Sequence, residues 1–104
     1  MQDLVKVDER RLYRRLDVML AGSFSKINFL ESAPNRVSAT ITNLSAAGLY
    51  IETEKALPSG SLVEVEFFLR GRKNRVKAEA MVRWVNRNSI GMEVGMGVEF
   101  LTKN

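Results

Sequence analysis

The stretch VEVEFFL at residues 63–69 decides the fold class, because apolar and charged side chains alternate along most of it. A period of two places alternate side chains on opposite faces of an extended strand, so that one face can be buried. The stretch VKAEAMVRW at residues 76–84 repeats this pattern after the turn-forming residues 70–74. The sequence therefore predicts two neighbouring strands, and the parity that Trp84 shares with Ala80 and Val82 predicts that Trp84 lies in the core. The alternative is that Trp84, near the end of its strand, stacks on a base.

Four further segments complete the pattern of short strands. Alternation marks residues 37–42 and 49–52, a weaker run covers residues 18–24, and residues 94–101 end the chain. Gly95 and Gly97 in the last segment suggest a bulge or a sharp bend. Six short strands separated by turns are typical of an all-β sandwich or barrel, and a barrel is favoured because closure removes exposed strand edges. We therefore predict an all-β barrel over residues 17–104.

Residues 1–16 lack this alternation, and we interpret them as a flexible basic N-terminal arm or a single helical turn. The segment ERRLYRR at residues 9–15 holds four arginines in six positions. A guanidinium can grip a phosphate with two hydrogen bonds, read the O6/N7 edge of guanine or stack on a base. Arg11 and Arg15 are four residues apart, as are Arg10 and Arg14, so each pair would share a face of a helical turn. The alternative is a solvated basic arm with no specific ligand.

A second motif, NLSAAG at residues 43–48, lies between two of the predicted strands. The side chains of Asn43 and Ser45 can cap a turn or hydrogen-bond a ligand. Gly48 can adopt a positive φ or let a ligand approach the backbone. The alternative is a tight connection in which Asn43 and Ser45 only stabilise the turn.

The amino-acid composition excludes several classes of functional site for this chain. The chain of 104 residues is long enough for one domain, and it has no cysteine and no histidine. Disulfides, Cys/His zinc sites, cysteine nucleophiles and histidine acid/base chemistry are therefore excluded. No carboxylate pair or serine shows a spacing that suggests catalysis, so we expect neither an enzyme nor a cofactor. The net charge of +4 permits an anionic partner.

The sequence also indicates where in the cell the protein is found. No apolar run approaches the roughly 20 residues that span a bilayer, and the first residues do not resemble a signal peptide. We expect a cytoplasmic protein without a membrane partner.

The two motifs together resemble the PilZ domain family, bacterial receptor modules for cyclic diguanylate (c-di-GMP). The match consists of RxxxR before the first strand, [D/N]xSxxG after the second, and GMGVEF at residues 95–100, which looks like the family's closing strand. The resemblance extends from about residue 9 to residue 101. It implies a six-stranded antiparallel β-barrel whose ligand carries two guanines and two phosphates.

The resemblance also implies a role for each motif residue. Arg11 and Arg15 would clamp phosphate and guanine. Asn43 and Ser45 would hydrogen-bond guanine or backbone, and Gly48 would keep the site open where a β-carbon would crowd it. We expect the arm to become ordered over the barrel when ligand binds, which would change the surface shown to a downstream protein partner.

Two features concern stoichiometry and assembly. Arg10 precedes the RxxxR motif, and in the family an arginine there tends to accompany two intercalated ligand molecules. Many family members continue into a helix that packs on the barrel, whereas three residues follow Leu101 here. Either the chain was trimmed or the barrel mouth is closed in another way, for instance by a second subunit in a homodimer.

Two other functions compete with this one. A small basic barrel can bind single-stranded nucleic acid through a charged groove and aromatic side chains. Aromatic residues make up only 8% of the chain, and the alternation assigns most of them to the core, which argues against nucleic acid. A family-like adaptor without a ligand is the other alternative, and the intact arm and turn argue against it.

Overall fold

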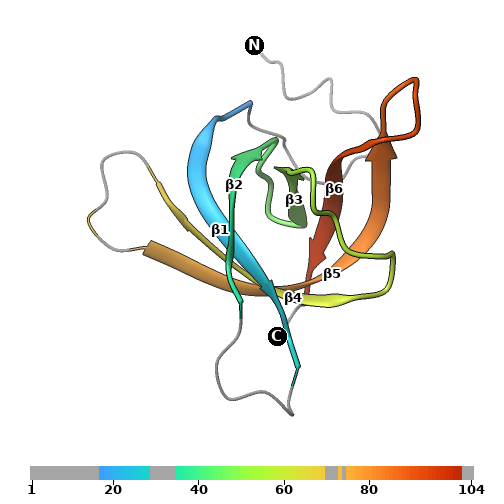
Figure 1. Cartoon of the computed structure of the whole chain (residues 1–104). Coiled ribbons are helices and arrows are strands. Elements are labelled where there is room, and N and C mark those ends of the chain that lie inside the picture. The colour runs from blue at the N-terminus through green and yellow to red at the C-terminus, as the bar shows by residue number, and fades with distance from the viewer. Residues whose placement is uncertain (1–16, 29–34, 70–72, 74, 102–104) are drawn as a thin grey trace, which may run out of the picture.

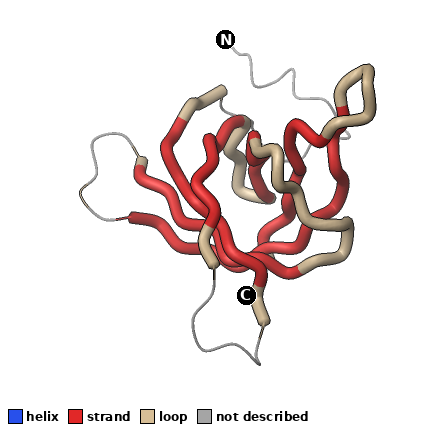
Figure 2. Tube along the Cα trace, in the orientation of Figure 1, coloured by secondary structure: helices blue, strands red, loops and turns tan. Residues whose placement is uncertain are grey.

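The computed structural model of the chain describes residues 17–28, 35–69, 73 and 75–101, and these residues form an antiparallel β-barrel. Around the closed barrel the strand order is β1-β2-β3-β6-β5-β4, and every neighbouring pair is antiparallel (Figures 1 and 2). The strands are β1 (Leu20–Lys26), β2 (Val37–Thr42), β3 (Gly48–Glu52), β4 (Leu62–Phe68), β5 (Arg75–Arg87) and β6 (Glu93–Phe100). The predicted six-stranded antiparallel barrel is confirmed.

Two meanders build the barrel. Strands β1 to β3 form one, strands β4 to β6 form the other, and the β1–β4 and β3–β6 ladders join them. No helix in the described residues is long and apolar enough to cross a membrane. The arm predicted over residues 1–16 lies outside the residues that the structure describes.

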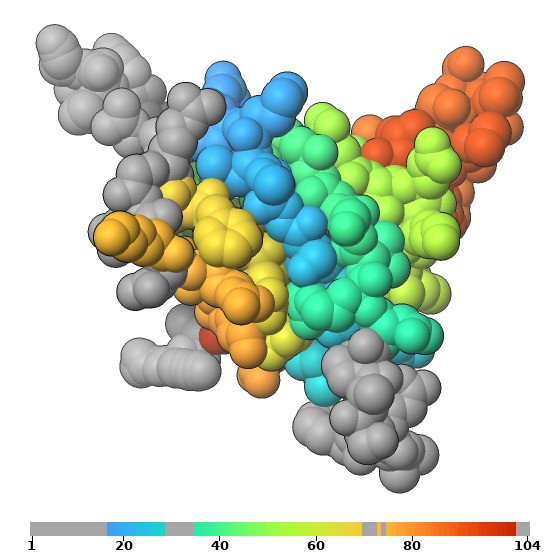
Figure 3. Space-filling view, turned by 60° about the vertical axis from the view of Figure 1, so that its left-hand side comes forward, coloured from blue at the N-terminus to red at the C-terminus, as the bar shows by residue number. Residues whose placement is uncertain are grey.

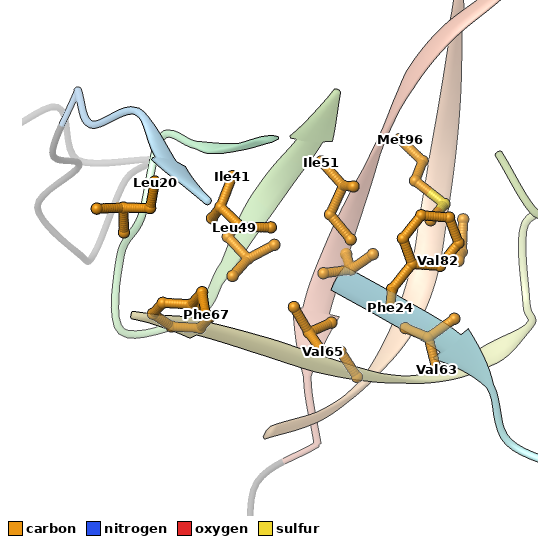
Figure 4. Close-up of a cluster of buried hydrophobic side chains, with 12 residues drawn as sticks. Leu20, Phe24, Ile41, Leu49, Ile51, Val63, Val65, Phe67, Val82 and Met96 are labelled. Carbon is orange, nitrogen blue, oxygen red and sulfur yellow. The ribbon is translucent and has the colours of Figure 1, made fainter. Parts of the chain in front are cut away.

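The core lies inside the barrel and is built from alternate positions of the strands, as the alternation predicts (Figure 4). Its largest fully buried side chains belong to Phe24, Ile41, Ile51, Met96, Val63, Val65 and Val82. Removing such side chains from water stabilises the fold by about 1.5–3 kcal/mol each, before the entropy lost on folding is counted.

Trp84 is the exception, because the prediction that it lies in the core is wrong. It is 49% exposed. Val82 pairs with Val98, and Trp84 pairs with the adjacent residue Gly97, so Arg83 is an extra residue in β5. This β-bulge shifts the parity by one, which turns Trp84 to the outer face and Val85 toward the core.

The predicted bulge near Gly95 and Gly97 is confirmed. Asn86 pairs with Gly95 and Arg87 with Glu93, which leaves Val94 as an extra residue in β6. A separate packing constraint also explains why both positions hold a glycine. A β-carbon on Gly95 would run into the ring of Tyr50, and one on Gly97 would run into the ring of Trp84.

The turn between β5 and β6 projects from the barrel, and it is drawn in dark orange in Figure 3. Asn88 organises it, because its Oδ1 accepts hydrogen bonds from the backbone N–H groups of Ile90 (3.1 Å) and Met92 (3.0 Å). Gly91 takes a φ of 84° at the tip. The side chains of Ile90 and Met92 are exposed as a result.

Candidate ligand-binding site

Asn43 begins the turn between β2 and β3 with a φ of 53°, and it is the only non-glycine residue with positive φ among the described residues. The left-handed conformation costs most side chains about 1–2 kcal/mol, and asparagine adopts it more readily than most. The side-chain amide of Asn43 makes no hydrogen bond with another residue in the described part of the chain, and the residue is half-buried. Its donors and acceptor are therefore open to a ligand.

Ser45 stabilises the turn from within. Its Oγ accepts hydrogen bonds from the backbone N–H groups of Ala47 (3.1 Å) and Gly48 (3.4 Å), and its own N–H donates to the Gly48 carbonyl at 2.9 Å. This is the turn-stabilising role that the sequence allowed as an alternative. The hydroxyl also donates to the Gly48 carbonyl at 3.4 Å, so its two lone pairs and its hydrogen are all used within the turn, and its contact with a ligand stays a prediction.

Gly48 is buried where β3 meets β6. Positive φ is confined to Gly60 and Gly91 among the described glycines, so Gly48 does not use the positive φ that the sequence allowed as one of two options. A β-carbon there would run into the carbonyl oxygen of Val98. The glycine is therefore needed for the close approach of the chain's own strand β6, and its expected role beside a ligand stays a prediction.

The start of β1 lies beside this turn. Leu20 pairs with Ile41, which stands two residues before Asn43, so the segment Asp17–Met19 leads into the barrel at the end of β2. Figure 1 shows the start of β1 and the end of β2 at the same end of the barrel. Arg10, Arg11 and Arg15 lie outside the described residues. The structure therefore brings together Asn43, Ser45 and Gly48 and leaves the contacts of the three arginines as predictions.

An aromatic pair continues the outer face next to the turn, and the sequence did not predict that Trp84 would pair with Tyr50. Tyr50 pairs across the strands with Thr42, and its ring stacks on that of Trp84 with centroids 5.4 Å apart and planes at 28°. Asn86 Nδ2 donates a hydrogen bond to the Tyr50 hydroxyl at 3.1 Å. The spacing Gly95-Met96-Gly97 was the available signal, since alternate glycines leave room for rings from neighbouring strands.

The arginines of the described barrel are already paired. Every arginine that the structure describes forms an ion pair with a carboxylate: Arg36 with Glu64, Arg75 with Glu66, Arg83 with Glu99 and Arg87 with Glu93. The Arg83 pair, at 3.0 Å, neutralises Glu99, the residue opposite Gly48 in the β3–β6 ladder. A free guanidinium for an anionic ligand must therefore come from another part of the chain.

Among the described arginines, Arg36 forms the most hydrogen bonds with other residues. It donates hydrogen bonds to the hydroxyls of Ser23 and Ser25, each at 3.0 Å, and to the Glu64 carboxylate at 2.9 Å. On the same strand as Glu64, the pKa of the Glu66 carboxyl lies below its ordinary value, because Arg75 donates a hydrogen bond to it and Arg36 and Lys77 add favourable charge. These groups hold β1, β2, β4 and β5 together.

A groove of about 420 Å³ lies elsewhere, where β6 ends against β5. Its lining includes the carboxylates of Glu64 and Glu79, which stand opposite each other in the β4–β5 ladder, and the apolar side chains of Phe100 and Leu101. Lys77 also lines the groove, so two negative side chains and one positive side chain face it, which makes it a poor site for an anion. No cluster of acidic residues that could hold a metal ion occurs in the parts of the chain that the structure describes.

Comparisons with known proteins agree with this geometry. The sequence matches the PilZ domain over residues 9–104. No curated protein matches it significantly.

Two solved structures share the fold. The structure of Bacillus subtilis Inhibitor of motility (MotI/DgrA) superposes with a TM-score of 0.73 at 19% identity, over 91% of this chain and 44% of that one. The PilZ domain with c-di-GMP of YcgR from Escherichia coli superposes with a TM-score of 0.65 at 16% identity, over 89% of this chain and 79% of that one. The chain thus spans less than half of the Bacillus protein. With the match over residues 9–104 and this barrel, the chain belongs to the PilZ domain family.

Proposed function

We propose that the chain is a receptor domain for c-di-GMP that acts on a downstream protein partner. One observation carries the proposal: β1 starts beside the end of β2, so the arginine-rich segment and the 43–48 turn connect to the same end of the barrel. Membership of the PilZ family and the c-di-GMP named for the similar YcgR domain support it. The protein would act as a receptor and effector, without catalysis or a cofactor, in the cytoplasm.

The charge of the ligand explains why the arm is needed. Two phosphates give c-di-GMP two negative charges, while the described arginines are all engaged with carboxylates. Arg11 and Arg15 would supply the clamp on phosphate and guanine. Arg15 lies five residues before Leu20, so the chain can place it at most about 18 Å from the start of β1. That reach is enough to fold the arm over the turn.

The turn would supply the polar contacts. The amide of Asn43 can pair with a guanine edge, and the Ser45 hydroxyl would reach the ligand by giving up its long hydrogen bond to the Gly48 carbonyl. Gly48 would let β6 lie close against the turn that carries these groups. Binding would order the arm over the barrel and change the surface that the partner meets, because the ligand favours the closed arrangement through its contacts to both parts.

Calorimetric titration of the whole chain with c-di-GMP tests the proposal. Loss of one paired, buried guanidinium contact costs about 2–5 kcal/mol, so Arg11→Ala or Arg15→Ala should weaken binding roughly 30-fold or more. Arg75→Ala is the matched control, since it removes the same charge from a residue that pairs with Glu66. Wild-type affinity in both arm variants, or an equal loss in the control, would contradict the clamp.

The same titration addresses stoichiometry. If Arg10 brings two intercalated ligands, saturation requires two molecules per chain, and one molecule per chain rejects that part of the proposal. Sedimentation analysis with and without ligand decides whether a homodimer forms.

A short oligonucleotide and GTP complete the experiment. The exposure of Trp84 removes one argument against a single-stranded nucleic acid as the ligand. Such binding would fall steeply with salt and would ignore the base. Tight, salt-sensitive binding of the oligonucleotide together with no binding of c-di-GMP would replace the proposed function by this one.

A further inference from the structure

We propose that copies of this chain associate head to tail, with the turn between β5 and β6 of one copy seated in the groove at the end of β6 of the next copy. The inference goes beyond the proposed function and does not depend on it. The turn, here called the tip, exposes the side chains of Ile90 and Met92. The lining of the groove includes the apolar side chains of Phe100 and Leu101. The tip is therefore an apolar projection, and the groove is a partly apolar recess.

The tip holds its apolar side chains in solvent by an ordered backbone. Ile90 is 76% exposed and Met92 is 55% exposed. Besides the two hydrogen bonds that the Asn88 side chain accepts, the Asn88 N–H donates to the Met92 carbonyl at 2.9 Å, and the Gly91 N–H donates to the Asn88 carbonyl at 3.0 Å. An ordered projection loses little conformational freedom when it enters a partner. Removal of both side chains from water favours contact with an apolar surface.

The groove suits such a projection in size and in charge. Its volume is about 420 Å³, whereas a cavity of about 150 Å³ already holds a benzene-sized group. Glu64 and Glu79 stand opposite each other in the β4–β5 ladder, where like charges are destabilising. Arg36 pairs with Glu64 and Lys77 with Glu66, which leaves Glu79 without a cation among the described residues. The groove therefore favours an entering segment that carries a positive charge.

Arg87 carries a positive charge at the base of the tip. Its side chain is 53% exposed, and it donates a hydrogen bond to the Glu93 carboxylate at 3.3 Å. A guanidinium has five N–H donors, and an exposed ion pair contributes little to stability. Arg87 can therefore keep its contact with Glu93 and also donate to Glu79 of the next copy.

One chain cannot place its own tip in its own groove. Strand β6 starts after the tip and ends at the groove, and its eight residues span about 26 Å (Figure 1). The contact therefore joins two different surfaces of two copies, which builds rings or open chains instead of a two-fold dimer. Two apolar side chains bury much less than the roughly 800 Å² per partner of a stable interface, so the association is weak and depends on concentration.

Sedimentation velocity from micromolar to millimolar protein, without ligand, measures this association. The average mass of the wild type should rise with concentration beyond that of a dimer. Ile90→Asp at the tip and Leu101→Asp at the groove should each weaken the association roughly tenfold or more. Ala21→Asp is the control, because it adds the same charge at an exposed position of β1, a strand that is next to neither β5 nor β6.

A mixture of the two variants tests the head-to-tail arrangement. Ile90→Asp keeps an intact groove and Leu101→Asp keeps an intact tip, so the mixture should form a one-to-one dimer that neither variant forms alone. A wild type that stays monomeric at millimolar concentration overturns the proposal. Association that Ile90→Asp leaves unchanged, or a mixture of folded variants that stays monomeric, overturns it as well.

A second measurement decides if Leu101→Asp fails to fold. Amide chemical shifts of the wild type should change on dilution at residues 88–92 and at residues 77–79 together, and changes confined to one of these regions overturn the proposal. Calorimetric titration with c-di-GMP keeps the two proposals apart. Ile90→Asp should bind c-di-GMP like the wild type, so failure of the head-to-tail contact leaves the receptor function standing.

Discussion

Replacement of Gly48 by alanine tests whether this glycine serves the packing of two strands. The new β-carbon would run into the Val98 carbonyl oxygen and come within 3.0 Å of the Glu99 Cα. Both are backbone atoms in a strand that the barrel holds on two sides, so no side-chain rotation relieves the contact.

The magnitude follows from two opposing effects. Overpacking of this kind costs about 1–3 kcal/mol, and the reduced freedom of the unfolded chain offsets about 0.4–1 kcal/mol of it. A net loss of about 1–2 kcal/mol should lower the melting temperature of a domain of this size by roughly 4–16 °C.

Thermal unfolding followed by circular dichroism, without ligand, measures the effect. Ala46→Ser is the control, because Ala46 is exposed in the same turn and such changes stay within about 0.5 kcal/mol. A Gly48→Ala variant that melts within about 3 °C of the wild type would refute the packing explanation. If the variant also binds c-di-GMP normally at a temperature where it is folded, Gly48 has no role at the ligand.

Three further substitutions have defined outcomes. Asn43→Val should destabilise the fold by about 1–2 kcal/mol in a urea titration, while Asn43→Gly should not, because only the former resists the left-handed φ. Ser45→Ala should cost about 1 kcal/mol in the same assay, since two backbone N–H groups lose their acceptor. The pKa of Glu66 is lowered in the fold, so its contribution is present above about pH 4.3 and is lost as the pH falls through the lower folded value. Glu66→Gln should therefore lower the melting temperature at pH 7, and the difference from the wild type should shrink as the pH falls below about 4.3.

The alternation of apolar residues was enough to predict the barrel, because each buried strand face repeats with a period of two. Residues such as Val63, Val65 and Val82 occupy the interior that this pattern assigns to them. The position of Trp84 could not be predicted in this way, because a bulge depends on the pairing of two strands. Within β5 alone, nothing marks Arg83 as the extra residue.

The 43–48 turn shows a second limit of prediction from the sequence. Asparagine, serine and glycine at these positions suit both a tight turn and a ligand contact, so the residue types alone left two interpretations. The structure adds the hydrogen bonds of Ser45 and the close approach of β6 to Gly48, which establish the structural role. Asn43 differs, because its side-chain amide has no hydrogen-bond partner among the residues that the structure describes. A contact between this amide and a ligand stays a prediction, which only a measurement with the ligand present can test.

Amide chemical shifts recorded with and without c-di-GMP test the central claim most directly. The account predicts that shifts change at residues 43–48 and at Arg11 and Arg15, while those around Glu64 and Glu79 in the groove at the end of β6 stay constant. Unchanged shifts throughout, or changes confined to that groove, would contradict a receptor site formed by the arm and the turn.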